Sequence, residues 1–259
     1  MKLSIITVNL NNAEGLRKTI ESVVTQTFPD FEYIIIDGYS TDGSVEIIKQ
    51  YADKITYWIS EPDKGIYNAM NKGILQAKGE YCLFLNSGDW LLEINGLETV
   101  FQKIYKEDII YCNIKTQLDE WIYPYHLSLF YFANKCIGHP SSFIKKILFH
   151  NIGLYDETFK ITSDYDFFLN AIIKNSCSYK HLDYFLSFFD LTGISSTHEI
   201  QKEIEKTNVI LKNFPDLFED IEDFKNTYKE LQFYKNSKLV QFLKKIQTNK
   251  LYKKIRNIK

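Results

Sequence analysis

Short apolar runs alternate with segments of helical spacing over the first 115 residues of the chain. The apolar runs, which predict β-strands, cover residues 3–8, 33–36, 55–59, 81–85 and 109–112. Apolar residues at helical spacing predict helices at 13–25, at 67–77 and in a segment that Ser44 is expected to cap. Continuous apolar strands separated by helices indicate βαβ units. We therefore expect an α/β fold with a Rossmann-like, mostly parallel sheet that helices flank on both faces.

The pattern changes in the second half of the chain. Residues 121–149 are aromatic-rich and irregular, helical spacing returns at 164–174, and a polar helical pattern begins near residue 198. We expect one domain over 1–197, with halves at 1–115 and 116–197, and a C-terminal helical extension over 198–259.

Composition restricts the classes of function. The chain has 259 residues and a net charge of −2, so it is not an electrostatic binder of nucleic acid. Four widely spaced cysteines form no CxxC pair, which favours buried free thiols and a reducing compartment over disulfides or zinc. The N-terminus does not read as a signal peptide, and no apolar run approaches the roughly 20 residues of a membrane span. We therefore expect a cytoplasmic protein.

The C-terminal tail is far more basic than the chain as a whole. Residues 235–259 contain nine Lys or Arg residues and no Asp or Glu, with apolar residues at roughly helical spacing. A basic amphipathic helix suits an anionic membrane surface, whereas the alternative is a solvated or partly disordered end. The first interpretation places the protein peripherally on the inner face of the plasma membrane.

Polar side chains follow the first two predicted strands. Thr7 and Asn9 end the first strand, and Asp37 directly follows the second. Ligands of open α/β sheets bind beyond the carboxyl ends of the strands, where Asp37 can accept hydrogen bonds from a nucleobase or a ribose hydroxyl. Asp42 and Ser44 are better explained as turn and helix-cap residues. No GxGxxG follows the first strand and no P-loop motif occurs, which disfavours nicotinamide cofactors and P-loop chemistry.

Two further polar clusters follow predicted strands. Asp63 and Lys64 lie just before a predicted helix, whose N-terminus favours anionic ligands, although a plain strand-to-helix loop would also explain Pro62 and Gly65. The strand at 81–85 ends in Asn86-Ser-Gly-Asp89. Asp89 could hold a divalent cation against a phosphate, but it is a single carboxylate, and hard cations usually take several protein oxygens.

A candidate base and two histidines lie further along the chain. Asp164 opens the helix predicted at 164–174 and could take the proton of an acceptor hydroxyl, or act only as an N-cap. Asp166 cannot share a helical face with it, so we expect Asp166 to be structural or secondary. His198 could approach a diphosphate or metal, although a lone histidine such as His139 or His198 is more often structural.

Taken in order, Thr7-Val8-Asn9, the runs 37–43 and 61–73, and Phe84-Leu-Asn-Ser-Gly-Asp89 resemble the family 2 glycosyltransferases of bacterial polysaccharide synthesis. The resemblance covers about residues 1–195. It implies a GT-A fold, a nucleotide-diphospho-sugar donor, Mg²⁺ or Mn²⁺, and inversion at the anomeric carbon. Residues 1–115 would then bind the donor, and residues 116–197 would supply the acceptor and catalytic side.

The resemblance also assigns residues by position, and it places His139 and Asp166 on the acceptor side. Those implied to bind the donor are Thr7, Asn9, Asp37, Asp63, Lys64, Asn86, Ser87 and Asp89, and the implied general base is Asp164. Asn86 and Gly88 stand where the family often has carboxylates, and Gly38 replaces a frequent second Asp. Asp89 is therefore the expected metal ligand, with His198 as a further candidate.

These observations predict an inverting hexosyltransferase. It would move a sugar, from a UDP-sugar by preference, to an acceptor hydroxyl of a growing surface glycan such as lipopolysaccharide, capsule or exopolysaccharide, free or lipid-linked. One alternative is a nucleotide-sugar-binding scaffold with weak catalysis. Another is a glycoside hydrolase in which Asp89 and Asp164 flank the glycosidic bond.

Overall fold

The computed structural model describes residues 1–248. The chain divides into two compact units, Met1–Asn213 and Phe214–Lys259. The sequence places the domain boundary at 197/198, whereas helix α9 (Glu199–Asn213) remains with the first unit because it packs against helix α7 (Ser163–Leu169).

A mixed β-sheet forms the centre of the first unit. Along the sheet the strand order is β3-β2-β1-β4-β8-β6-β9-β5, and β7 pairs with β6. The strands are β1 (Leu3–Asn9), β2 (Phe31–Asp37), β3 (Tyr57–Ser60), β4 (Tyr81–Phe84), β5 (Trp90–Leu91), β6 (Ile109–Lys115), β7 (Glu120–Trp121), β8 (Ser142–Lys145) and β9 (Tyr179–Phe188).

The predicted parallel arrangement holds for β3, β2, β1 and β4. Their register places Asn9 beside Asp37 and Asp37 beside Ser60, so polar residues at three strand ends share one edge. β8 runs antiparallel between β4 and β6. The sequence pattern missed β8 because this strand has only four residues and lies within the aromatic-rich stretch 121–149.

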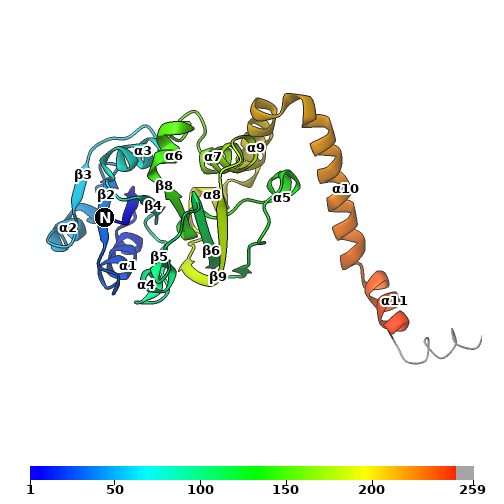
Figure 1. Cartoon of the computed structure of the whole chain (residues 1–259), viewed down its shortest axis with the longest axis horizontal. Helices are drawn as coiled ribbons and strands as arrows, with labels where there is room; N and C mark the ends of the chain where they lie inside the picture. Colours follow the sequence, from blue (N-terminus) through cyan, green and yellow to red (C-terminus); the bar gives the residue numbers. More distant parts are fainter. Residues whose placement is uncertain (249–259) are drawn as a thin grey trace, which may run out of the picture. The chain divides into compact units, whose positions relative to one another are not determined.

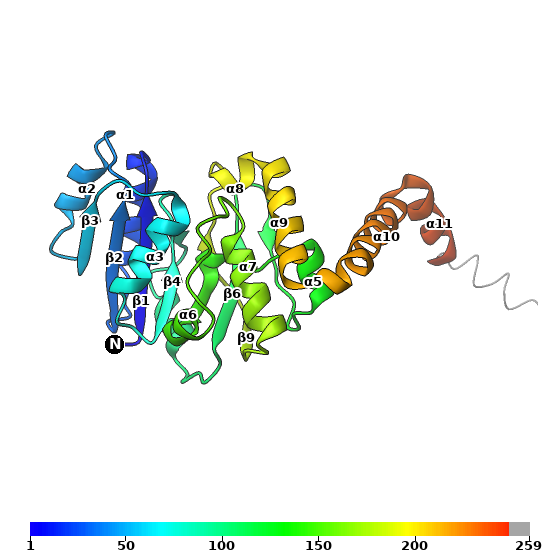
Figure 2. The same cartoon turned by 90° about the horizontal axis from the view of Figure 1, so that it is seen from above.

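Helices cover both faces of the sheet, as predicted. Helices α3, α6 and α7 lie on one face, and α1 and α4 lie on the other (Figure 1 and Figure 2). The remaining helices of this unit are α1 (Ala13–Val24), α2 (Ser44–Gln50), α3 (Ile66–Gln76), α4 (Gly96–Phe101), α5 (Leu129–Asn134), a 3₁₀ turn (His139–Ser141), α6 (Lys146–Asn151), a π-helical turn (Asn170–Lys174) and α8 (Ile194–Thr197).

Each face has its own apolar core. Leu16, Ile20 and Val23 of α1 are fully buried against the sheet, where each side chain contributes about 1.5–3 kcal/mol. On the other face the core is aromatic, with the Phe149 and Phe167 rings stacked at 4.6 Å. These two layers hold the carboxyl ends of the parallel strands in place.

The start of α2 differs from the expectation at Ser44. The N-cap is Gly43, whose φ of +95° suits glycine, and Ser44 is the first helical residue. Asp42 takes the capping role, because its Oδ1 accepts hydrogen bonds from the Ser44 backbone N–H and hydroxyl. Its Oδ2 accepts from the Ala13 N–H, so Asp42 also joins α2 to the start of α1.

The second unit contains a 3₁₀ turn (Pro215–Leu217), α10 (Phe218–Asn236) and α11 (Lys238–Thr248). The part of the predicted amphipathic tail beyond residue 248 lies outside the described residues. None of the described helices is both long enough and apolar enough to cross a membrane.

Helix α9 holds the loop that leads into α7. The Glu205 carboxylate is only 4% exposed and accepts from the backbone N–H groups of Lys160 (3.0 Å), Ile161 (2.9 Å) and Thr162 (3.1 Å). Burial by itself raises the pKa of Glu205, but hydrogen bonds from Gln201 and from this backbone lower it on balance. The loop therefore depends on an ionised carboxylate supplied by α9.

We expect Glu205→Gln to lower the free energy of unfolding by about 1–3 kcal/mol at pH 7, since an amide N–H₂ would face backbone donors. The folded-state pKa lies below the unfolded value, so this stabilisation is present above about pH 4.3 and is lost as the pH falls through the folded-state value. Urea titrations at pH 7 and pH 3 test this. Glu203→Gln, an exposed position on the same helix, is the control. Equal stability of wild type and Glu205→Gln at pH 7 would show that the Glu205 carboxylate does not stabilise the loop before α7.

Candidate active site

Asp37 joins the ends of three parallel strands. The side chain is fully buried, and its Oδ1 accepts from Asn9 Nδ2 (2.7 Å) and Ser40 Oγ (2.6 Å). Its Oδ2 accepts from the Ser40 N–H (3.0 Å) and Ser60 Oγ (2.6 Å). Asn9 Oδ1 remains buried without a hydrogen-bond partner. Asp37 thus orients Asn9, and Asn9 carries the unsatisfied acceptor of this pair.

Three other residues predicted to bind the nucleotide-sugar donor lie outside the hydrogen-bond network of Asp37. Thr7 is fully enclosed, and its hydroxyl lies 3.0 Å from the Tyr33 hydroxyl rather than at the strand end. Asp63 is partly exposed and lies against Gly38, where an added Cβ would come within 2.6 Å of Asp63 Oδ2. The glycine at position 38 therefore makes room for Asp63. Lys64 is exposed just before α3.

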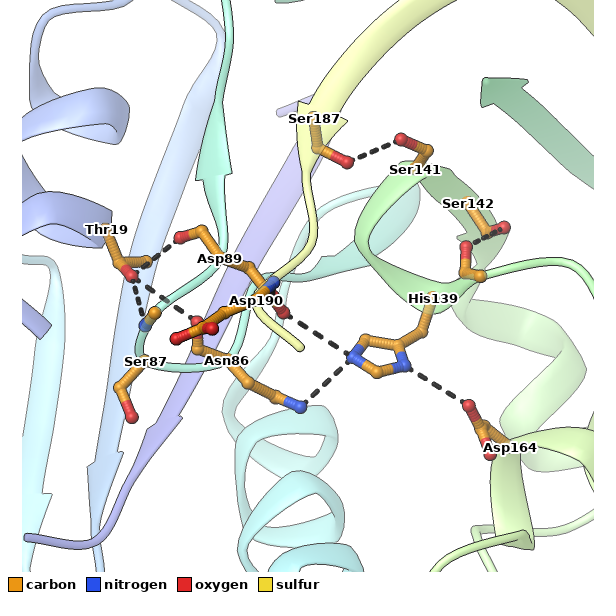
Figure 3. Close-up of polar contacts among 12 residues, drawn as sticks. Thr19, Asn86, Ser87, Asp89, His139, Ser141, Ser142, Asp164, Ser187 and Asp190 are labelled. Carbon is orange, nitrogen blue, oxygen red and sulfur yellow. Dashed lines mark hydrogen bonds and ion pairs between the residues drawn. The ribbon is translucent and has the colours of Figure 1, made fainter. Parts of the chain in front are cut away.

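Thr19 of α1 fixes the turn at residues 86–89, a role that its sequence did not reveal (Figure 3). Its Oγ1 donates to the Asp89 carbonyl (2.7 Å) and accepts from the Gly88 N–H (3.0 Å). Gly88 has a φ of +107°, and an added Cβ would lie 2.7 Å from Asp190 Oδ2. Ser87 is held through its carbonyl by Asn12. The turn is thus rigid, and it presents Asn86 and Asp89 beyond β4.

Asp89 is buried without full compensation. It is 3% exposed, its Oδ1 accepts from the Asp190 N–H (2.9 Å), and its Oδ2 has no hydrogen-bond partner. The pKa of Asp89 is raised to about 7, mainly by burial and to a small extent by the charge of Asp190, although His139 and backbone hydrogen bonds oppose the shift. Asp190 reaches this place because β5 pairs with the end of β9. A second carboxylate, that of Asp190, therefore comes from 101 residues further along the chain; it lies against Gly88 and accepts from Gln117 and Thr192.

His139 lies between the 86–89 turn and Asp164 (Figure 3). Its Nδ1 is 3.2 Å from Asp164 Oδ2, and because a carboxylate only accepts, Nδ1 donates. Its Nε2 is 3.0 Å from Asn86 Nδ2 and 3.8 Å from Asp89 Oδ2. Burial lowers the pKa of His139, but Asp164 and Asp89 raise it on balance. The expected acceptor-side histidine therefore touches both predicted halves of the site.

Asp164 is the second residue of α7, and the N-cap is Thr162, so Asp164 is not the cap. The Tyr67 hydroxyl of α3 lies 3.0 Å from Asp164 Oδ1, and the Tyr165 N–H donates to the same oxygen. Burial raises the pKa of Asp164, but the hydrogen bond and charge of His139, followed by Tyr67, lower it on balance. Asp164 is therefore ionised at neutral pH, as a base must be.

The remaining candidates lie elsewhere. Asp166 is buried and turned toward α9, where it accepts from Asn213 Nδ2 (2.6 Å) and pairs with Lys212 (3.0 Å). It therefore fastens α7 rather than facing His139. His198 follows α8, is exposed, and contacts the Thr197 hydroxyl through Nδ1 (2.9 Å).

The residues around Asp89 suit a divalent cation only in combination with a ligand. Within the described part of the chain, no three His, Cys, Asp or Glu side chains are grouped to hold a metal ion. Asp89 offers one buried, unpaired carboxylate oxygen, and Asp190 lies beside it. Two carboxylates fit Mg²⁺ or Mn²⁺ when diphosphate oxygens and water complete the coordination.

We expect Asp89→Asn to stabilise the protein while it removes activity. Because the folded-state pKa is raised, the wild type loses stability as the pH rises from about 4, the unfolded value, and the loss is complete above the folded-state value. The variant should exceed the wild type by about 1–4 kcal/mol at pH 8 and match it near pH 4. Urea unfolding at both pH values measures this, with exposed Asp119→Asn as the control. A less stable Asp89→Asn variant at pH 8 would be the opposite result.

Comparison with known proteins identifies relatives of this chain. The family described as "Glycosyl transferase family 2" matches residues 4–166. An uncharacterized glycosyltransferase of Mycobacterium tuberculosis is 32% identical over 214 residues, which cover 76% of this chain and 78% of that protein. A PGL/p-HBAD biosynthesis glycosyltransferase of Mycobacterium bovis is 28% identical over 211 residues, with 78% and 82% covered.

Solved structures share the fold at lower identity. S. aureus TarS 1–349 in complex with UDP-GlcNAc has a TM-score of 0.64 at 20% identity, over 82% of this chain and 67% of that one. The mannosyltransferase PcManGT of Pyrobaculum calidifontis, in complex with GDP-Man and Mn²⁺, also has a TM-score of 0.64 at 12% identity, over 98% and 82%. The predicted GT-A fold is confirmed. On the family match and these relatives, the chain belongs to glycosyltransferase family 2 and is a glycosyltransferase.

Proposed function

We propose that this enzyme transfers a sugar, with inversion, from a UDP-sugar to a hydroxyl of a surface glycan. One observation carries the proposal: the imidazole ring of His139 lies between the carboxylates of Asp89 and Asp164. Asp89 would face the donor diphosphate, and Asp164, on the other side of the ring, would be the ionised base. Inversion requires these two functions on opposite sides of the anomeric carbon. The TarS structure with UDP-GlcNAc supports a uridine donor, although PcManGT holds GDP-Man.

The donor would lie along the carboxyl ends of β1, β2 and β4. Asn9, oriented by Asp37, would offer its unpaired Oδ1 to the base or ribose, with Asp63 and Lys64 at the border. Asn86, Ser87 and Asp89 would face the diphosphate. Asp89 and Asp190 would hold a divalent cation, which when bound neutralises the charge of the departing diphosphate.

The chain's own residues would position the acceptor and accept the proton. Asp164 would receive the proton of the acceptor hydroxyl while that oxygen forms its bond to the anomeric carbon. The bond from the anomeric carbon to the diphosphate oxygen breaks at the same time, and the nucleotide diphosphate leaves with the electron pair. Tyr67 and His139 would keep the Asp164 carboxylate aligned through this step.

The proposed acceptor class is supported by the name of one relative. The Mycobacterium bovis relative is named for PGL/p-HBAD biosynthesis, which supports a lipid-linked or glycan acceptor for this chain as well. The family match and the glycosyltransferase relatives favour transfer over the hydrolase alternative and over a scaffold without catalysis.

Asp164→Asn should reduce transfer by about 10²- to 10⁴-fold while nucleotide binding is retained, because only the base is removed. Purified enzyme is incubated with UDP-, GDP- and CDP-sugars, with and without Mn²⁺, and sugar-dependent nucleotide release is measured alongside UDP binding by calorimetry. Asp53→Asn, exposed and outside the site, is the matched control. Failure of the wild type to turn over any donor with any acceptor would overturn the function, and full activity of Asp164→Asn would overturn the base.

We further propose that residues 235–259 bind an anionic membrane surface near a lipid-linked acceptor. Helix α11 exposes three large apolar side chains at helical spacing: Leu239, Phe242 and Leu243. The sequence of this segment is basic throughout. Apolar insertion together with attraction to anionic headgroups is the usual basis of such binding.

Replacing Leu239, Phe242 and Leu243 together by Ser should abolish cosedimentation with vesicles that contain anionic lipid, because the apolar contribution is lost. Deletion of 235–259 should do the same. Vesicles of neutral lipid alone should bind neither the wild type nor the variants. Undiminished binding of the deletion variant to anionic vesicles would disprove the role of the tail.

A further inference from the structure

We propose that His139 is a positioning residue that holds the base Asp164 and the donor-side turn 86–89 at a fixed separation. One ring nitrogen serves each side: Nδ1 faces Asp164 Oδ2 at 3.2 Å, and Nε2 faces Asn86 Nδ2 at 3.0 Å. The inference rests on the proposed function, because Asp164 is the base of that proposed reaction and His139 is inferred to align it.

The backbone that carries His139 is fastened on both sides. The Gly138 N–H donates to the Tyr123 hydroxyl (3.0 Å), and the Gly138 carbonyl accepts from Ser142 Oγ (2.7 Å). A Cβ on Gly138 would lie 2.4 Å from Ile114 Cδ1, so this backbone lies directly against β6. Ser141 Oγ pairs with Ser187 Oγ of β9 at 2.6 Å (Figure 3). Contacts with the sheet therefore fix the backbone position from which the His139 side chain extends.

The ring itself has little freedom. The side chain is 12% exposed, and its ring meets the Phe189 ring edge-on at a centroid distance of 6.1 Å. Both ring nitrogens have partners, so rotation of the ring would break two contacts inside the protein. A buried, doubly engaged imidazole is thus a rigid spacer between its two neighbours.

The donor side of the contact is built to receive Nε2. Asn86 Oδ1 and Asp89 Oδ2 are both buried without hydrogen-bond partners. When Nδ1 of the neutral ring donates to Asp164, Nε2 accepts from the Asn86 amide nitrogen; when the ring is protonated, Nε2 donates, and the Asn86 oxygen accepts after a half-turn of the amide. His139 thereby links the end of β4 to the start of α7, two elements that carry the proposed donor and base functions.

The two nitrogens can be tested separately by substitution. In His139→Asn the side-chain amide occupies the region of Nδ1 and can still donate to Asp164, but it falls short of Asn86. In His139→Gln the amide reaches the region of Nε2 and can contact Asn86, but it leaves Asp164 without this donor. His139→Ala removes both contacts. The control is His150→Gln, because His150 is exposed on α6 and contacts only Asn151 among the described polar partners.

We expect a split between the kinetic constants, because misplacement of a reacting group by about 1 Å costs up to about 10²-fold in rate. His139→Gln should lower kcat by about 10- to 100-fold with little change in donor KM. His139→Asn should keep kcat within about 3-fold and raise donor KM by about 10-fold. Equal effects of Asn and Gln on both constants, or wild-type kinetics in all three variants, would overturn the proposal.

A measurement on the wild type covers the case in which the variants fail to fold. In long-range ¹H–¹⁵N spectra, Nδ1 of His139 should carry a proton that is protected from exchange, because it donates to buried Asp164. An Nδ1 without a proton would overturn the proposal. An inactive wild type would instead refute the proposed function, and the spectrum would still report on the Nδ1 contact.

Discussion

The burial of carboxylates at the carboxyl edge of the sheet governs the design of this site. A carboxylate removed from water must replace its lost contacts with water by hydrogen-bond donors or by an opposite charge. Asp37 does so through Asn9, Ser40 and Ser60, and Asp164 through His139 and Tyr67. Asp89 does not, and its pKa of about 7 records the deficit. This uncompensated carboxylate, together with the unpaired buried oxygens of Asn9 and Asn86, indicates a place for a ligand.

The alignment of Asp164, the proposed base, depends on contacts from outside its own helix. Glu205 of α9 binds the backbone just before α7, and Lys212 with Asn213 binds Asp166 on the far side of α7 from His139. Asp164 and Asp166 are two residues apart, yet one meets the site and the other meets α9. Helix α9, which the sequence assigns to a polar C-terminal extension, is therefore part of the structure that positions Asp164.

Much of the candidate site was predictable because its residues follow buried strands. Asn9, Asp37, Asn86 and Asp89 end apolar runs, and parallel strands bring their carboxyl ends to one edge. Thr19, Tyr67 and Asp190 carried no such signal. Thr19 and Tyr67 lie on helices amid ordinary core residues, and Asp190 depends on a pairing between β5 and β9 that local spacing does not encode. Thr7 was expected at the rim, but it lies two residues before the end of β1, where its hydroxyl meets that of Tyr33 inside the sheet.

The sequence by itself determined the α/β alternation, the parallel first half of the sheet and the order of the polar strand ends. These properties follow from hydrophobic periodicity, which is local. Only the tertiary structure decided which carboxylates share a neighbour, how deeply each is buried and therefore how each pKa shifts. His139 illustrates the reason: it lies 50 residues from Asp89 and 25 from Asp164 in the chain. It touches both because the antiparallel strand β8, inserted between β4 and β6, brings it there.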